Sequence, residues 1–202
     1  MIFYDLKAGM HPRRVRILMA EKGISIDSRE VDIVSKANLA PQFLGMNRLG
    51  KLPVLQLDDG SAISESLAIC RYLDQRFPGP ALFGATPEQS AHIDMWVLRM
   101  ELELSKPVTD VFMHSSEFFK NRIKQVPAVA DWARDKVMPT FDWLNDELSS
   151  REFIASDHYT MADIVAQCAL VLGKAAQLRI GEQHAHLARW FASVTSRPSA
   201  RA

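Results

Sequence analysis

The fold is decided by the stretch Asn47-Arg48-Leu49-Gly50-Lys51-Leu52-Pro53-Val54-Leu55, whose proline stands at the entrance of an apolar, strand-like run. Proline cannot donate a hydrogen bond to a sheet and normally avoids strand interiors. A cis Leu52-Pro53 bond in a tight turn would leave the amide and carbonyl of the preceding residue facing outward, where they can bind a peptide backbone. A trans proline at a strand edge is the alternative, since cis is the minority form of an X-Pro bond. The neighbouring sequence decides between the two.

A hairpin and a helix start follow this stretch. Residues 53–57 and 61–64 flank Asp58-Asp59-Gly60, and Asp-Gly supplies the positive φ angles of a tight turn between antiparallel strands. Glu65-Ser66 then opens a helix, where Ser66 and the first free amides form an anion site suited to a carboxylate. Glu65 can accept from an ammonium group, so an α-amino-acid head would have both of its charges matched. From spacing alone, a plain helix cap is equally open.

The first 80 residues alternate extended and helical patterns in the order strand, helix, strand, short helix, strand, strand, helix. This order is typical of an α/β domain. Residues 2–6 and 25–33 have strand-like patterns, while helical stripes end at Gly23 and at Phe77. Pro78-Gly79-Pro80 stops the helix that ends at Phe77, and we interpret this tripeptide as a domain boundary. The predicted domains are residues 1–80 and residues 87–202.

Beyond this tripeptide the sequence predicts only amphipathic helices, over residues 87–119, 127–148, 160–178 and 183–194. The second domain is therefore predicted to be all-helical. Pro139 removes a backbone donor inside the second of these helices, so we expect a kink or break there. Thr160 and Asp163 form a capping box at the start of the third helix, which favours a structural role for Asp163 over a metal-binding or catalytic one.

Composition excludes several classes of function. The chain carries 24 Lys and Arg against 24 Asp and Glu, so it lacks the basic surplus of nucleic-acid-binding proteins. No apolar run approaches the roughly 20 residues that cross a bilayer, so we expect no membrane partner. The first short apolar run is followed directly by the acid Asp5, unlike a secretion signal, so we expect a cytoplasmic protein. Cys70 and Cys168 fit buried hydrophobic positions. His184 and His186 alone are weak evidence for a metal, and no metal site is predicted.

Three segments together resemble the glutathione transferase superfamily over essentially the whole chain, and bacterial members of theta-like or nu-like type in particular. They are residues 15–24, Val-Arg-Ile-Leu-Met-Ala-Glu-Lys-Gly-Ile, the stretch 47–55 with Glu65-Ser66 after it, and the capped segment Thr160-Met161-Ala162-Asp163-Ile164. The resemblance implies the glutathione transferase fold, an α/β thioredoxin-like N-terminal domain followed by an all-α C-terminal helical domain. It also implies glutathione as co-substrate.

The resemblance implies roles for individual residues in binding glutathione. Leu52, next to cis Pro53, would pair through its backbone with the cysteinyl part of the tripeptide. Glu65 and Ser66 would hold the γ-glutamyl head.

Two further residues correspond to positions that reach the glycine carboxylate in theta-like relatives, Lys51 and Asn38. The ammonium group of Lys51 is chemically suited to that anion. A merely solvated surface lysine is the alternative, since most surface lysines have no dedicated partner.

The sequence departs from the family in the turn at residues 7–12, which lacks the serine, cysteine or asparagine that usually activates the thiol. Pro12 fits the first helical position, which makes His11 the N-cap, at the end of the helix that favours a thiolate. Either neutral His11 donates one N–H bond to the sulfur, or the backbone amides alone lower the thiol pKa. Tyr4 is the other candidate side chain for activating the thiol. It ranks below His11, because it lies in a strand of alternating pattern, where a packed aromatic is favoured.

Three arginines crowd the same helical turn, Arg13, Arg14 and Arg16. They either attract anionic glutathione or, as the preferred interpretation, form a solvated or interface-pairing face, because cations are disfavoured at a helix N-terminus.

The implied reaction is nucleophilic transfer, in which the thiolate attacks a small apolar electrophile held by the helical domain. An apolar stripe there supplies mostly core and part of a pocket; its members are Trp96, Val97, Met100, Leu104, Val108 and Phe112. The family's two-fold dimers predict a homodimer. The alternatives are a non-catalytic glutathione-binding or scaffold protein of the same fold, and a glutathione-dependent lyase or dehalogenase.

Overall fold

The computed structural model describes residues 1–202 and divides them into two compact units. The first unit comprises Met1–Ala81 with Arg201–Ala202, and the second comprises Leu82–Ala200. None of the helices combines the length and the apolar character that crossing a bilayer requires.

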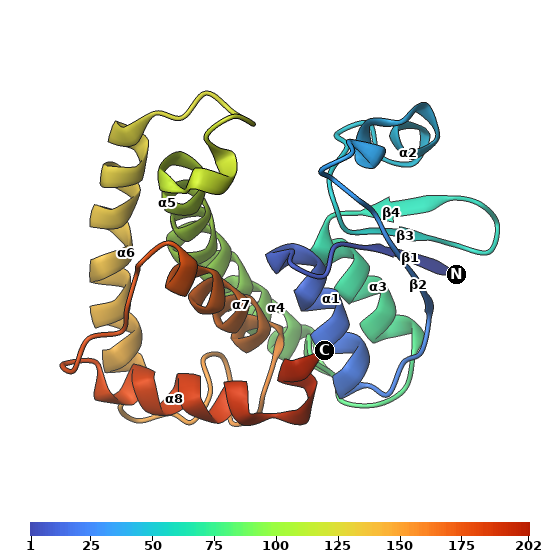
Figure 1. Ribbon diagram of the computed structural model, residues 1–202. Coiled ribbons are helices and arrows are strands. Elements are labelled where there is room, and N and C mark those ends of the chain that lie inside the picture. The colour runs from blue at the N-terminus through green and yellow to red at the C-terminus, as the bar shows by residue number, and fades with distance from the viewer. The chain divides into compact units, whose positions relative to one another are not determined.

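The first unit has the predicted order of elements: β1 (Ile2–Asp5), α1 (Met10–Glu21), β2 (Asp27–Glu30), the 3-10 helix η1 (Ala37–Leu39), α2 (Pro41–Met46), β3 (Val54–Gln56), β4 (Ala62–Ser64) and α3 (Ser66–Arg76). The strands form one mixed sheet in the order β2-β1-β3-β4, in which only the pair β1 and β2 is parallel. Helices α1 and α3 lie side by side on one face of the sheet and α2 lies on the other (Figure 1). The predicted thioredoxin-like fold is confirmed.

Strand alternation divides the core of the first unit between these two faces. Phe3 pairs with Leu55 across β1 and β3, and both side chains are fully buried. On the opposite face Val54 packs with Phe43 of α2, and Tyr4 is partly buried against the same cluster. Side chains at successive positions of a strand point to opposite faces, so β1 and β3 each contribute to both layers.

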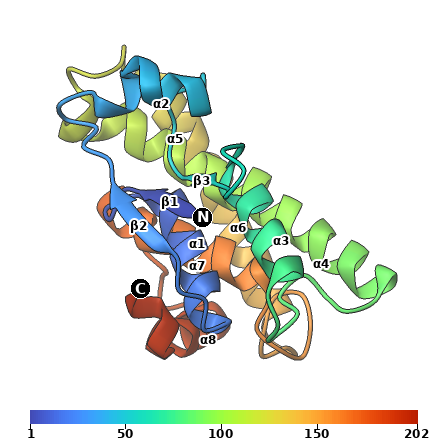
Figure 2. The same cartoon turned by 90° about the vertical axis from the view of Figure 1, so that its right-hand side faces the viewer.

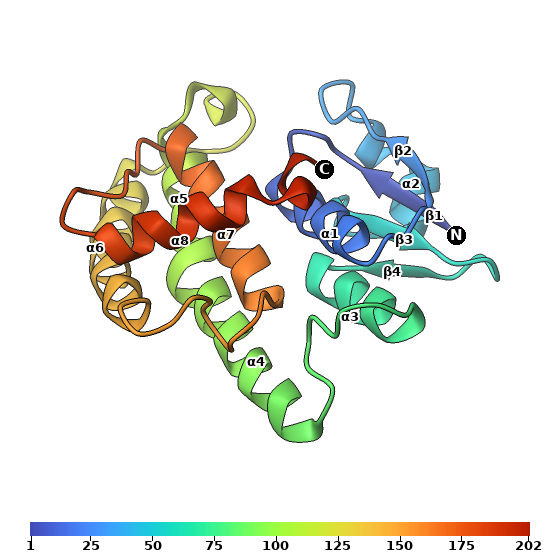
Figure 3. The same ribbon diagram turned by 90° about the horizontal axis from the view of Figure 1, so that it is seen from below.

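The second unit is helical, as predicted. Its elements are α4 (Pro87–Arg99), the π-helix η2 (Met100–Ser105), α5 (Lys106–Ser115), the 3-10 helix η3 (Glu117–Phe119), α6 (Pro127–Glu147), α7 (Met161–Ala175), α8 (Ala185–Ser196) and all but the last residue of the 3-10 helix η4 (Pro198–Arg201). Helix α7 forms the centre of this unit, because all of residues 161–170 are buried. Helix α8 crosses it and also contacts α6 (Figure 3).

A π-helix interrupts the first predicted helix of the second unit. Helices α4 and α5 continue one another along a single path with η2 between them (Figure 2). Pro107 has no amide to donate to the Glu103 carbonyl, and the Thr140 hydroxyl of α6 donates to that carbonyl instead, at 3.0 Å. The Lys106 amide bonds to the Glu101 carbonyl five residues back, which is the π-helical pattern.

The break predicted at Pro139 is absent, because α6 runs as one helix through this residue. The neighbouring Thr140 hydroxyl donates to the Lys136 carbonyl as well as to that of Glu103 on η2. Packing against η2 and α5 therefore supports the helix where a backbone hydrogen bond is missing.

Candidate functional site

Sheet register brings three separate segments of the first unit to one end of the sheet. Tyr4 pairs with Val54, and Val54 pairs with Ser64, both in antiparallel register. Three segments therefore lie at the same end of the sheet: the turn that follows β1, the Leu52-Pro53 pair that precedes β3, and the Glu65-Ser66 pair that follows β4. Facing residues of antiparallel strands are about 5 Å apart, so these segments are direct neighbours.

The Leu52-Pro53 peptide bond is cis, as the sequence predicts. Pro53 is buried, whereas Leu52 is partly exposed. The amide and the carbonyl of Leu52 make no hydrogen bond within the chain. Leu52 thus offers one donor and one acceptor of the main chain at the end of the sheet where the three segments meet.

Two asparagines hold the loop that leads to this proline. The Asn38 side-chain amide donates to the Gly50 carbonyl at 2.7 Å, and that of Asn47 donates to the Lys51 carbonyl at 2.9 Å. Gly50 has a φ of 60°, and a Cβ atom there would lie 2.8 Å from Leu39 Cδ2. Asn47 therefore positions the loop, a role that no local sequence pattern indicates, and Asn38 also acts on the loop. Lys51 is exposed.

Glu65 forms the corner between β4 and α3 in a strained backbone conformation, with φ 69° and ψ 119°. Such conformations cost of order 1–3 kcal/mol in a residue other than glycine and cluster at ligand sites. The exposed Glu65 is the N-cap of α3, and the buried Ser66 is its first residue. A carboxylate acceptor thus stands beside a helix N-terminus whose first amides have no partner within the helix.

Arg14 is buried beneath this helix start, with 1% of its surface exposed. Its Nη1 atom donates to Ser66 Oγ at 3.4 Å. The sequence favours a solvated or interface-pairing face for these arginines, and solvation is wrong for Arg14, because α1 packs against α3 and turns this side chain inward. The guanidinium adds positive charge to the end of α3 that already favours an anion.

Helix α1 begins earlier than predicted. Its first residue is Met10 and its N-cap is Gly9, so His11 is the second helical residue and not the N-cap. Gly9 is extended, and its amide donates to the Leu6 carbonyl at 2.7 Å, which closes the turn one step before the expected position. Pro12 is tolerated at the third helical position because amides of the first turn have no partner within the helix. His11 lies one turn before Arg14, on the same face of the helix.

Tyr4 directs its hydroxyl away from this end of the sheet. The hydroxyl donates to Gln56 Oε1 at 3.3 Å, and the ring meets that of Phe43 edge to face at 6.0 Å between centroids. Gln56 is the last residue of β3, so it lies at the end of the strand that is farther from Leu52. The geometry therefore favours the packed aromatic over a role at the site.

Comparison with known proteins identifies the family. The model of the glutathione S-transferase N-terminal domain matches residues 3–81, and that of the C-terminal domain matches residues 108–198. Glutathione S-transferase 2 of Saccharomyces cerevisiae is 33% identical over all of this chain and 88% of its own length. The chain belongs to the glutathione S-transferase superfamily.

Solved structures of glutathione S-transferases agree in fold over the full length. A glutathione S-transferase domain-containing protein of Marinobacter aquaeolei superposes with a TM-score of 0.94 at 35% identity, covering 98% of this chain and 99% of that one. Gtt2 of Saccharomyces cerevisiae superposes with a TM-score of 0.93 at 34% identity, covering 100% and 99% of the two chains. The predicted glutathione transferase fold is confirmed.

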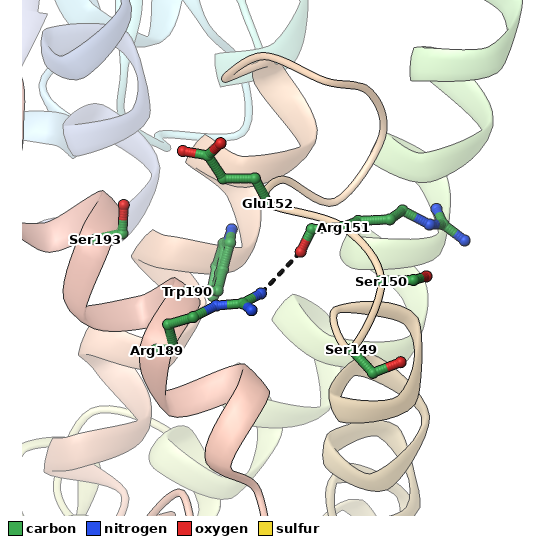
Figure 4. A pocket seen from close by; sticks show the side chains of 7 residues that line it. All are labelled: Ser149, Ser150, Arg151, Glu152, Arg189, Trp190 and Ser193. Atoms are coloured by element: carbon green, nitrogen blue, oxygen red, sulfur yellow. Dashed lines mark hydrogen bonds between the residues drawn. The ribbon is translucent and has the colours of Figure 1, made fainter.

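In this glutathione S-transferase chain one pocket of the second unit is structural in character. It encloses about 510 Å³ and is lined by Ser149, Ser150, Arg151, Glu152, Arg189, Trp190 and Ser193 (Figure 4). The Arg189 guanidinium donates to the Arg151 carbonyl at 2.8 Å and to the Leu148 carbonyl at 2.7 Å. It thereby ties α8 to the end of α6. No residue predicted for glutathione binding lines this pocket.

The remaining sequence candidates have structural roles in the second unit. His184 is buried, with one ring nitrogen 2.8 Å from Asp142 Oδ1 and the other accepting from the Gly181 amide at 3.2 Å. Cys168 is buried, as is Cys70 in the first unit, and neither takes part in a disulfide. No group of three or more His, Cys, Asp or Glu side chains in residues 1–202 has the arrangement of a metal site.

The apolar stripe of α4, η2 and α5 is mostly core, as predicted. Trp96, Val97, Met100, Leu104 and Val108 are buried. Phe112 is partly exposed and meets Phe119 edge to face at 5.6 Å between ring centroids. This stripe therefore leaves only its last member accessible to a ligand.

Proposed function

We propose that this chain is a glutathione transferase that binds glutathione in its first unit and transfers it to a small apolar electrophile. The observation that carries the proposal is the sheet register, which puts the Leu52 backbone and the Glu65-Ser66 corner at one end of the sheet. The Leu52 amide and carbonyl pair with the cysteinyl residue of the tripeptide. Ser66 and the first α3 amides bind the γ-glutamyl carboxylate, and Glu65 accepts from its ammonium group.

Lys51 attracts the glycine carboxylate as a point charge. Asn38 contributes to the same subsite chiefly by holding the Gly50 carbonyl, since one of its amide hydrogens already donates there.

The thiol is activated at the start of α1. The first-turn amides carry the positive end of the helix dipole, which stabilises a thiolate. Neutral His11 adds one N–H donor from the same turn. The thiolate then forms a carbon–sulfur bond to the electrophile, and the leaving group departs with its electron pair. We further propose that the helical second unit holds the electrophile, that the protein forms a homodimer, and that it acts in the cytoplasm on compounds to be detoxified.

The decisive experiment measures retention on immobilised glutathione together with conjugation of a generic aryl halide. We expect both, and we expect Ser66→Ala to weaken retention. A second function, glutathione binding without turnover, is favoured by the lack of a hydroxyl or thiol side chain at residues 7–12. Retention with no conjugation would select that second function, and failure of both would refute glutathione as the ligand.

His11 is tested by the pH dependence of thiolate absorbance in the glutathione complex. We expect His11→Ala to raise the pKa of the bound thiol, because one donor to the sulfur is lost. The matched control is His158→Ala, which removes an exposed imidazole of the second unit and should leave the titration unchanged. An unchanged titration in His11→Ala as well would show that the backbone amides act alone.

A further inference from the structure

An ion pair between Asp5 and Arg16 closes the turn that joins β1 to α1. Arg16 Nη1 lies 2.5 Å from Asp5 Oδ1, and the two side chains are only 15% and 6% exposed. A guanidinium that is largely removed from water needs an opposite charge, and the carboxylate at the end of β1 supplies it. Of the two forms that the sequence favours, a solvated or an interface-pairing face, the solvated one is therefore wrong for Arg16.

The same guanidinium holds the backbone of the turn. It donates to the Lys7 carbonyl at 2.9 Å and to the Leu6 carbonyl at 3.4 Å, and Asp5 Oδ1 accepts from the Leu6 amide at 2.7 Å. The Leu6 carbonyl also accepts from the amide of Gly9, the N-cap of α1. One connected set of hydrogen bonds thus runs from Arg16 to the N-cap of α1.

Gly9 has little freedom within this turn. A Cβ atom at Gly9 would lie 2.9 Å from the Leu6 carbonyl oxygen and 2.9 Å from Pro12 Cδ. A second charged pair, Lys7 and Glu30 of β2, meets the turn from outside at 3.8 Å and is largely exposed. An exposed pair of this kind contributes little, so the buried Asp5 and Arg16 pair dominates the local electrostatics.

We propose that Arg16, with Asp5, is a positioning residue for the thiolate of bound glutathione. This inference rests on the proposed function. Arg16 does not touch the sulfur; it fixes the Leu6 and Lys7 carbonyls, and thereby holds the N-terminus of α1, the positive end of the helix dipole, at the point where the thiolate is stabilised. Loosening this clamp lowers the thiolate fraction while leaving the subsites at Leu52 and Ser66 intact.

The test substitutes Arg16→Lys in the full chain. Lysine keeps the charge and its pairing with Asp5 but lacks the planar fork that reaches two carbonyls. We expect the pKa of the bound thiol to rise by about one unit, which means about tenfold less thiolate and a correspondingly lower kcat at neutral pH. The KM for glutathione should stay near the wild-type value. A purely structural arginine would leave the thiol titration of the folded fraction unchanged.

The matched control is Lys22→Arg, at the other end of α1. The Lys22 side chain is buried, pairs with Asp74 at 2.9 Å and donates to a backbone carbonyl, that of Pro80, but it does not contact the turn. Conservative replacement of this cation should leave the thiol titration unchanged. An equal shift in both variants would overturn the inference, because it would show a general effect of disturbing α1.

A second variant, Asp5→Asn, keeps the test decisive if Arg16→Lys does not fold. It removes the charge that anchors Arg16 and should raise the thiol pKa in the same direction. Glutathione binding with identical titrations in the wild type and the folded variant would overturn this inference alone. A wild-type protein that binds no glutathione would overturn the proposed function and the inference with it.

Discussion

Arg14 brings a positive charge into the interior of the first unit, directly under the start of α3. Its guanidinium donates to Ser66 Oγ, so this hydroxyl oxygen is already an acceptor. The hydroxyl hydrogen is then free to point outward as a donor. Arg14 therefore orients Ser66 for a carboxylate and adds a charge that strengthens that bond.

Replacing Arg14 with methionine should weaken glutathione binding by about tenfold or more, since hydrogen bonds that involve charged groups contribute about 1.5–3 kcal/mol. The dissociation constant is measured by calorimetry for Arg14→Met, Ser66→Ala and the double variant. Because Arg14 acts through Ser66, the double variant should lose less than the sum of the two single losses. Full additivity would show that Arg14 does not orient this hydroxyl.

Asp163 is the point at which α7, the preceding loop and α8 are joined. Its Oδ2 atom accepts from the Thr160 amide at 2.9 Å and from the Thr160 hydroxyl at 3.0 Å. Its Oδ1 atom accepts from the Ile154 amide and from Trp190 Nε1, both at 2.9 Å. The predicted capping box is confirmed, and the carboxylate extends it to α8.

Asp163→Asn should destabilise the protein by about 2–4 kcal/mol, because an amide presents a donor to groups that are themselves donors and leaves one of them buried without a partner. Urea denaturation gives the free energy of unfolding. The control is Asp157→Asn in the same loop, where the carboxylate is exposed and should be dispensable. Equal stability of Asp163→Asn and the wild type would refute the capping role.

The same residue gives a defined pH dependence. Burial raises the pKa of the Asp163 carboxyl, against the opposing effect of its four hydrogen bonds. The folded chain then keeps this proton at a pH where the unfolded chain has lost it, so the contribution of Asp163 to stability falls as the pH rises from about 3.8, its ordinary value, through the folded value. The stability difference between the wild type and Asp163→Asn should therefore narrow over that range.

Local signals predicted the elements, and tertiary contacts set the details that the sequence missed. Asp58-Asp59-Gly60, Pro78-Gly79-Pro80 and the Thr160 cap act within a few residues, so the hairpin, the end of α3 and the start of α7 follow from sequence. The π-helix depends on Pro107 together with a hydroxyl from α6. The burial of Arg14 depends on the packing of α1 against α3, which no local pattern records.

Two exposed leucines bear on the oligomeric state of the protein. Leu98 and Leu102 are 57% and 59% exposed and lie four positions apart along α4 and η2. Large apolar side chains grouped on a surface indicate a contact with another protein, and self-association through a two-fold axis is the commonest arrangement. We expect this surface to form the predicted homodimer.

Light scattering should therefore report a dimer for the wild type and a monomer for the variant that carries both Leu98→Glu and Leu102→Glu. The charges would be buried without partners in the interface, which is strongly unfavourable. The control is Trp132→Glu, which removes an exposed aromatic side chain of α6. Dimers that persist in the double variant would place the contact elsewhere, and dissociation caused by Trp132→Glu would place it on α6.

The backbone of Glu65 has a consequence for any attempt to make the protein more robust. Glycine at this corner would adopt φ 69° without steric cost and would relieve much of the strain. It would also remove the carboxylate proposed to accept the ligand's ammonium group. Thermal stability thus favours glycine at position 65, whereas ligand binding favours glutamate there.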